Sequence, residues 1–232
     1  LASPDGFLIT DFSPEAASAR VRVANGQIAI SEMTTRDRAG STIDVPSGTI
    51  SHWRGSIFLP IVALNTLLDQ LQHPPEHGPY QEDVLALRVL EREPDRLRLF
   101  IRMTRTKIVT VTYNTEHRLD YHRYARTRAS SWSVSTRIVE LDGVGTANER
   151  ERPQGEDRGF LWRLNSYWRY EQVSGGVIVE LESVTLSRSV PTVLRVAKPM
   201  IDRIARESIH RTLEHIRQMF APAAVRRTGG GA

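Results

Sequence analysis

The chain has 232 residues, 40% of them hydrophobic, and a formal net charge of +4 at pH 7. This length and composition support one core, and the absence of cysteine excludes disulfides, a thiolate nucleophile and thiolate metal ligands. The basic residues are 29 Arg with only Lys107 and Lys198; they are interleaved with acids and form no run, so no nucleic-acid partner is expected. The longest apolar stretches, such as 57–64, are too short to span a bilayer.

The N-terminal third predicts two helices and two strands. Residues 13–24 predict a helix with Ser13 as N-cap and Pro14 at the first helical position, preceded by an N-terminal extension over 1–12. Residues 27–34 and 48–60 predict strands. A short amphipathic helix is predicted over 61–71, where apolar residues recur at helical spacing: Ile61, Leu64, Leu67, Leu68 and Leu71.

Beyond the Pro- and Gly-containing break at 73–83, the hydrophobic period changes from 3.6 to 2. Such a run predicts a twisted antiparallel meander of long strands over 84–93, 96–105, 107–119, 129–141, 159–171 and 176–188. The polar, Gly-rich stretch 143–159 predicts an exposed, mobile loop within it.

The last hairpin can be predicted in register. A two-residue turn at Ser174 and Gly175 gives an apolar face that pairs Trp168 with Leu181, Tyr170 with Val179 and Leu164 with Thr185. The other face, predicted to meet solvent, then pairs Arg169 with Glu180 and Tyr167 with Glu182. A slip of one residue would destroy both agreements.

The chain becomes helical again after Pro191. Pro199 is expected to break this region into a short segment and a main helix over 201–220, and residues 221–232 are predicted to be a flexible tail. One helix face is mostly apolar: Ile201, Ile204, Ala205, Ser208, Ile209, Thr212, Leu213, Ile216 and Phe220. This face needs an apolar partner, and the sheet offers the only large one. The pattern therefore predicts one α+β domain over 13–220, with a curved antiparallel sheet around a long C-terminal helix.

The element order and four sequence strings resemble the START/Bet v 1-like superfamily, also called SRPBCC or polyketide cyclase/lipid-transport-like. The strings are SHWRGSIFLP at 51–60, VTVTYNTEH at 109–117, the segment 159–191 from GFLWRLNSYW to SRSVP, and RES at 206–208. They are most similar to a bacterial subgroup whose ligand the resemblance does not specify. The resemblance implies a helix-grip fold, with a sheet that grips the terminal helix and holds an apolar small molecule or lipid beneath it.

Strand alternation predicts which side chains point toward that helix: Trp53, Leu99, Ile101, Met103, Val109, Val111, Tyr113, Trp132, Val134, Trp162, Leu164 and Trp168. Aromatic stripes usually form ordinary core, so a further alternative is a ligand-free structural or interaction domain with a filled core and an external interaction surface. Polar residues on the same faces are more informative because burying them unpaired costs about 1–3 kcal/mol each: His117, Thr136, Ser166 and Ser183. The predicted ligand-binding set is His117, Tyr113, Ser166, Ser183, Trp53, Trp132, Trp162, Trp168 and Met103.

A cyclase or aromatase acting on a polyketide-like substrate is the enzymatic alternative, and catalysis is the less favoured of the two. It needs an acid and a base near one substrate. Glu116 and His117 are adjacent in a strand and point to opposite faces, so Tyr113 and His117 form the only local acid/base pair. No catalytic residue is assigned.

No cofactor or metal site is predicted, because no His or carboxylate spacing matches a metal motif and no phosphate-binding loop occurs. The chain begins at Leu1 without Met, and members of the resembling subgroup often carry an export signal, so a periplasmic or secreted form is favoured over a cytoplasmic one. A monomer is favoured as the oligomeric state.

Overall fold

The computed structural model describes residues 6–75, 77–78, 80–106, 110–153, 155–188 and 198–221, with side chains in the last range from Arg203. In chain order the elements are η1 (Ile9–Phe12), α1 (Ala16–Ala24), β1 (Ala29–Glu32), β2 (Gly48–Pro60), α2 (Leu64–Gln72), β3 (Val84–Glu93), β4 (Arg96–Thr106), β5 (Thr110–Ala125), β6 (Arg128–Asp142), β7 (Arg150–Glu151), β8 (Arg163–Val173), β9 (Gly176–Arg188) and α3 (Lys198–Met219). The predicted strands over 48–60, 84–93 and 176–188 are confirmed to the residue.

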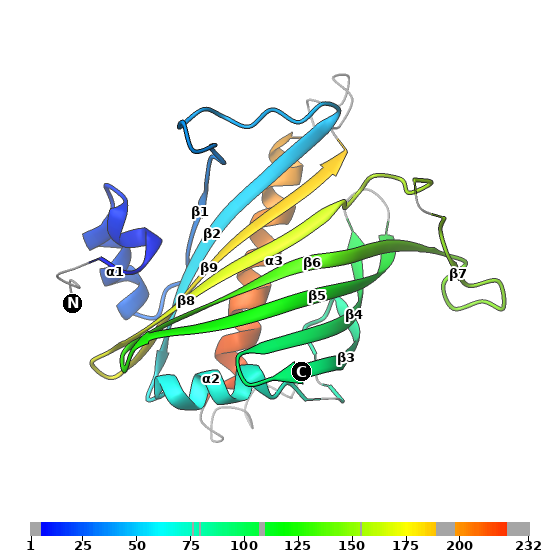
Figure 1. Ribbon diagram of the computed structural model, residues 1–232. Helices are drawn as coiled ribbons and strands as arrows, with labels where there is room; N and C mark the ends of the chain where they lie inside the picture. The colour runs from blue at the N-terminus through cyan, green and yellow to red at the C-terminus, as the bar shows by residue number, and fades with distance from the viewer. Residues whose placement is uncertain are drawn as a thin grey trace, which may run out of the picture.

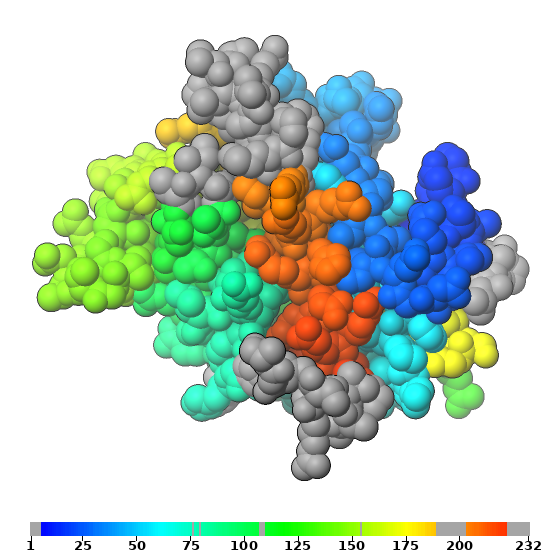
Figure 2. All heavy atoms as spheres, turned by 180° about the vertical axis from the view of Figure 1, so that it is seen from behind, coloured from blue at the N-terminus to red at the C-terminus, as the bar shows by residue number. Residues whose placement is uncertain are grey.

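The strands of the described residues form one antiparallel sheet in the order β1-β2-β9-β8-β6-β5-β4-β3, with β7 paired to β6. The sheet curves around α3, which lies along its concave face (Figure 1). Seen from behind, α3 lies between the β1–β2 side and the β3–β5 side (Figure 2). The predicted α+β helix-grip architecture is therefore confirmed. Pro199 lies in the first turn of α3, where proline is tolerated, and does not separate a shorter helix within the described range.

Close approach of α3 to β2 is possible because β2 has glycine at the contact. A Cβ atom at Gly55 would lie 2.5 Å from Leu213 Cδ1 and 2.6 Å from Ile209 Cγ2. Around this contact, the inward side chains of β2 and β9, such as Ile57 and Val179, are fully buried with those of α3. The main core therefore lies between the concave face and the C-terminal half of α3.

The predicted register of the β8–β9 hairpin is confirmed at every pair, including Trp168 with Leu181 and Arg169 with Glu180. The prediction that the second face meets solvent is wrong, because Glu180 is only 1% exposed. The N-terminal segment covers it: Glu180 accepts hydrogen bonds from the backbone N–H groups of Ile9 and Thr10 at 2.5 and 3.0 Å.

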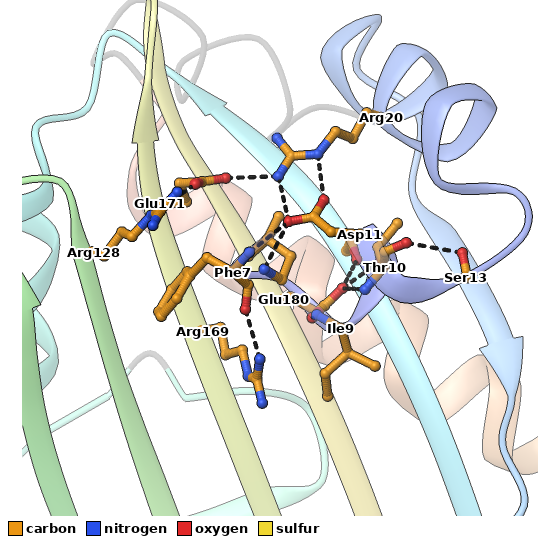
Figure 3. A network of polar contacts seen from close by, with 12 residues as sticks. Phe7, Ile9, Thr10, Asp11, Ser13, Arg20, Arg128, Arg169, Glu171 and Glu180 are labelled. Carbon is orange, nitrogen blue, oxygen red and sulfur yellow. Dashed lines mark hydrogen bonds and ion pairs between the residues drawn. The ribbon is translucent and has the colours of Figure 1, made fainter. Parts of the chain in front are cut away.

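A buried charge network extends this N-terminal layer across the convex face (Figure 3). Arg20 of α1 donates to both carboxylate oxygens of Asp11 and, at 2.8 Å, to Glu171 of β8. Arg128 of β6 pairs with the same Glu171 at 3.2 Å. A small second core lies beside the network, where Leu8, Val23 and Ile178 are buried. Residues 7–23 thus form a packed outer layer on β8, β9 and β2.

Two helix starts differ from their predictions. Ser13 ends η1, with its hydroxyl donating to the carbonyl of Thr10, and α1 begins only at Ala16 with Glu15 as its N-cap. Ile61 is 87% exposed and lies outside α2, because it has a positive φ of 65° and its N–H bonds to Gly175 in the neighbouring turn. Val62 packs against the core in its place.

The described residues of the stretch 143–159 fold back along β6. Its short strand β7 pairs Arg150 and Glu151 with the end of β6, and the backbone N–H of Arg152 bonds to the carbonyl of Glu140. Gly159 has a positive φ, and β8 starts only at Arg163, four residues later than predicted.

Candidate functional site

A cavity of about 460 Å³ lies under the N-terminal half of α3, beside the main core. Five strands contribute to its walls, together with the segments before β3 and β8. The lining residues are Ser51, Trp53, Glu82, Asp83, Thr104, Arg105, Thr106, Val111, Tyr113, Phe160, Leu161, Leu164, Ser183, Thr185, Ile204, Ala205, Glu207, Ser208, Ile209 and Arg211. Its volume falls in the range of about 300–1,000 Å³ that is usual for small-molecule sites.

Much of the wall is apolar because strand alternation turns large side chains toward α3. Trp53 of β2 and Val111 of β5 are both buried, and Leu164 of β8 lies on the same concave face. From the helix, Ala205 and Ile209 close the cavity. Ala205 also packs against the main core, so the cavity and the core meet at this point of the helix.

One side of the cavity carries a charged cluster. The Nη1 atom of Arg105 lies 3.2 Å from Asp83 Oδ2 and donates a 2.6 Å hydrogen bond to the hydroxyl of Ser208 on α3. The Arg105 side chain is surrounded by protein but remains 31% exposed, and it borders the cavity. Burial lowers the pKa of Arg105, while the Asp83 carboxylate opposes this shift. Arginine stays protonated in proteins, so the cavity wall contains a charged guanidinium group.

Tyr113 borders the same end of the cavity and is completely buried. Its hydroxyl has no hydrogen-bond partner among the described residues. Burial raises the pKa of Tyr113, and the nearby Glu140 carboxylate raises it further. The phenol therefore stays protonated, and its hydroxyl is a hydrogen-bond donor without a partner on a residue of the cavity lining.

Three of the nine predicted ligand-binding residues line this cavity: Trp53, Tyr113 and Ser183. Met103 is buried but absent from the cavity lining; it pairs across the strands with Tyr113, a lining residue. Ser166 and Trp168 face α3 but lie outside the cavity lining, and the Trp168 indole donates to the Ser166 hydroxyl at 3.1 Å. Val109, also expected to point inward, lies outside the described residues.

His117 was the first polar candidate, and it has two protein neighbours in place of a ligand. Its Nε2 lies 3.1 Å from the hydroxyl of Thr115, and its Nδ1 lies 3.3 Å from that of Ser133. Burial lowers the pKa of His117 to about 4, so the ring is neutral at pH 7. His117 is absent from the cavity lining, and it does not form an acid/base pair with Tyr113 within the described structure.

The predicted inward orientation of Trp132 is wrong. Trp132 pairs with Asp120 on the convex face, where its indole donates to the Asp120 carboxylate and stacks on His122. The next residue, Ser133, faces inward instead, because it pairs with Leu119, which packs against the main core. Val134 therefore shares the convex face. Thr136 is the extra residue of a bulge; it is exposed, and its hydroxyl bonds to the carbonyl of Glu116.

Trp162 precedes β8 and lies outside the cavity lining, with its indole donating to Asp157 at 3.0 Å. The sequence analysis missed Arg105, although it continues the inward alternation of Ile101 and Met103 and so stood out as a charged residue on that face. Asp83 and Ser208 gave no comparable signal, since their position depends on how the segment before β3 and the helix pack.

Within the described ranges, no helix is long and apolar enough to cross a membrane. The same residues contain no cluster of three or more His, Asp or Glu side chains that could hold a metal ion. The features of the cavity that could contact a ligand are its apolar wall, its Arg105–Asp83 pair and its hydroxyl groups.

No family model matches the chain, and no curated protein matches it. Among solved structures, a STAR-related lipid transfer protein fragment from Xanthomonas axonopodis superposes with a TM-score of 0.52 at 13% identity, covering 77% of this chain and 96% of that one. The ZhuI aromatase/cyclase from Streptomyces sp. R1128 follows with 0.49 at 10% identity, covering 79% and 100%. Human StAR-related lipid transfer protein 5 gives 0.48 at 13% identity, covering 84% and 81%.

At these identities the likeness concerns the fold alone. The chain has a START-like helix-grip fold, as the resemblance implied. What this chain binds must be argued from its own cavity.

Proposed function

We propose that this protein binds a compact, largely apolar small molecule in the cavity beneath α3. The observation that carries the proposal is the 460 Å³ space walled by Trp53, Val111, Leu164 and Ile209 beside a few polar groups. Apolar cavities with a small number of polar groups are the usual form of small-molecule sites. The names of the similar structures, lipid transfer proteins and an aromatase/cyclase, support the same class of ligand.

The size of the cavity favours a compact ligand. A volume of 460 Å³ equals a cube about 8 Å on a side, whereas each leaflet of a bilayer provides about 15 Å of hydrocarbon thickness for its lipid chains. A single short chain or a small ring system fits this space better than a two-chain lipid. Binding is proposed ahead of cyclase catalysis because His117, one member of the only local acid/base pair in the sequence, is bonded to Thr115 and Ser133 outside the cavity.

Filling the cavity should weaken binding. Ala205→Trp places an indole in the space beneath α3, and we expect it to weaken binding of the neutral fluorophore N-phenyl-1-naphthylamine at least tenfold, because bound ligands of this size are enclosed on most sides. The measurement is a fluorescence titration, with circular dichroism to show that the variant is folded.

Ala17→Trp is the matched control, since Ala17 is exposed on α1, and it should leave the affinity unchanged. Equal affinity of wild type, Ala205→Trp and Ala17→Trp for the fluorophore would contradict the proposal, because the probe would then bind elsewhere.

A further inference from the structure

Three hydroxyl groups form a polar wall on the β2–β9 side of the cavity. The strand register places Ser51 opposite Thr185 and Trp53 opposite Ser183, so the three hydroxyl residues are neighbours on the concave face. All three line the cavity. Across the described part of the chain, none of their hydroxyls has a hydrogen-bond partner within the protein.

Tyr113 supplies a fourth unpartnered hydroxyl, on β5. In the sheet order, β8 and β6 separate β9 from β5. Tyr113 and the hydroxyl wall therefore lie on the same concave face but on strands with two others between them. Between them lie apolar residues, including Leu164 of β8. A buried hydroxyl without a partner costs about 1–3 kcal/mol, and this cost disappears when a ligand supplies an acceptor.

The charges around the cavity disfavour an anionic ligand. Three carboxylates line it, from Glu82, Asp83 and Glu207, against the two guanidinium groups of Arg105 and Arg211. Arg105 is already engaged with Asp83 and Ser208. Glu82, Glu207 and Arg211 are exposed, and Glu207 is paired with Arg203. A fatty acid would therefore bring a negative charge to a lining whose half-buried cation, Arg105, is already engaged, and burying that charge unpaired is expensive.

We infer that the ligand is an uncharged molecule with an apolar body and two separated oxygen functions, one bound by Tyr113 and the other by Ser51, Ser183 and Thr185. This inference rests on the proposed function and specifies the class of ligand for the same cavity. Hydroxyl and carbonyl groups both fit, since each accepts the hydrogen bond that a tyrosine, serine or threonine donates.

The test compares three ligands that share a ten-carbon chain: 1-decanol, 1,10-decanediol and decanoate. Each displaces N-phenyl-1-naphthylamine from the wild-type protein in a fluorescence titration. The hydrophobic effect alone ranks decanol above the diol, because the second hydroxyl makes the chain less apolar. We expect the reverse order, with the diol bound about tenfold more tightly than decanol and decanoate bound most weakly.

Two variants locate the contacts. Tyr113→Phe and the double variant Ser183→Ala/Thr185→Val should each lower the affinity for the diol about tenfold and leave that for the apolar fluorophore unchanged. Tyr113→Phe should also keep or raise the melting temperature of the free protein, since it removes an unpartnered buried hydroxyl. Tyr167→Phe, on the convex face, is the matched control and should change neither affinity.

Tighter binding of decanol or decanoate than of the diol, or unchanged affinity for the diol in both variants, would overturn the inference and leave the proposed function standing, provided that the fluorophore still binds. Failure of the fluorophore to bind wild-type protein would instead count against the proposed function itself.

Discussion

Replacing Arg20 with methionine is expected to lower the free energy of unfolding by about 3–5 kcal/mol, the usual cost of leaving buried charges without their partner. The Arg20 side chain is 7% exposed, and those of its partners Asp11 and Glu171 are 8% and 5% exposed. Methionine keeps most of the side-chain volume and removes the charge. Two carboxylates on the convex face would then lose a bidentate and a single charge-assisted hydrogen bond.

The stability that Arg20→Met loses should depend on pH. Burial raises the pKa of Asp11, but the hydrogen bonds from Arg20, Phe7 and Leu8 outweigh it and hold the pKa below the usual 3.8. A carboxyl with a lowered pKa in the folded state stabilises the protein above its unfolded pKa, and this contribution disappears as the pH falls through the folded value. The difference between wild type and Arg20→Met should therefore be full at pH 7 and narrow below about pH 4.

Urea unfolding at pH 7 and pH 3 measures both effects. Arg203→Met is the control, because Arg203 is 80% exposed in its pair with Glu207, and such surface pairs contribute about 0–1 kcal/mol. A loss below 1 kcal/mol for Arg20→Met at pH 7 would mean that the N-terminal layer is not held by this network.

Gly55→Val should destabilise the protein by about 1–3 kcal/mol through overpacking, despite the higher strand propensity of valine. Even the Cβ atom of the new side chain would lie 2.5 Å from Leu213 Cδ1 and 2.6 Å from Ile209 Cγ2, so α3 or β2 must shift. The substitution tests whether α3 packs against β2 as closely as the contacts at Gly55 indicate.

A double-mutant cycle distinguishes this collision from a general effect of the substitution. Leu213→Ala removes the colliding methyl group, so Gly55→Val should cost at least 1 kcal/mol less in that background, as measured by urea unfolding. Thr49→Val, at an exposed position of the same strand, should change stability by less than about 0.5 kcal/mol. Additive effects of Gly55→Val and Leu213→Ala would contradict the contact.

The sheet and its packing against the C-terminal helix could be predicted from the sequence. Long period-two segments and the turn at Ser174 and Gly175 determine the register of the β8–β9 hairpin, because one face must be apolar along its whole length. The same alternation gave the wrong orientation for the residues of β6. There the apolar Trp132 packs on the convex face against His122, and serine residues face the helix.

The outer layer was missed for a physical reason. Arg169 facing Glu180 has the pattern of a solvent-exposed ion pair, and only the folded position of residues 7–12 shows that Glu180 is covered. The volume of the cavity could not be predicted either, since it depends on how far side chains such as Ala205 fill the space beneath α3. His117 was chosen for its chemistry, but which hydroxyls surround its ring depends on packing. Export remains a prediction.

A crystal structure of the protein with N-phenyl-1-naphthylamine tests the central claim most directly. We expect density for one molecule of the probe between α3 and the concave face of the sheet, in contact with Trp53, Leu164 and Ile209. Density on the convex face, or an unoccupied cavity beneath α3 in crystals that contain the bound probe elsewhere, would contradict it.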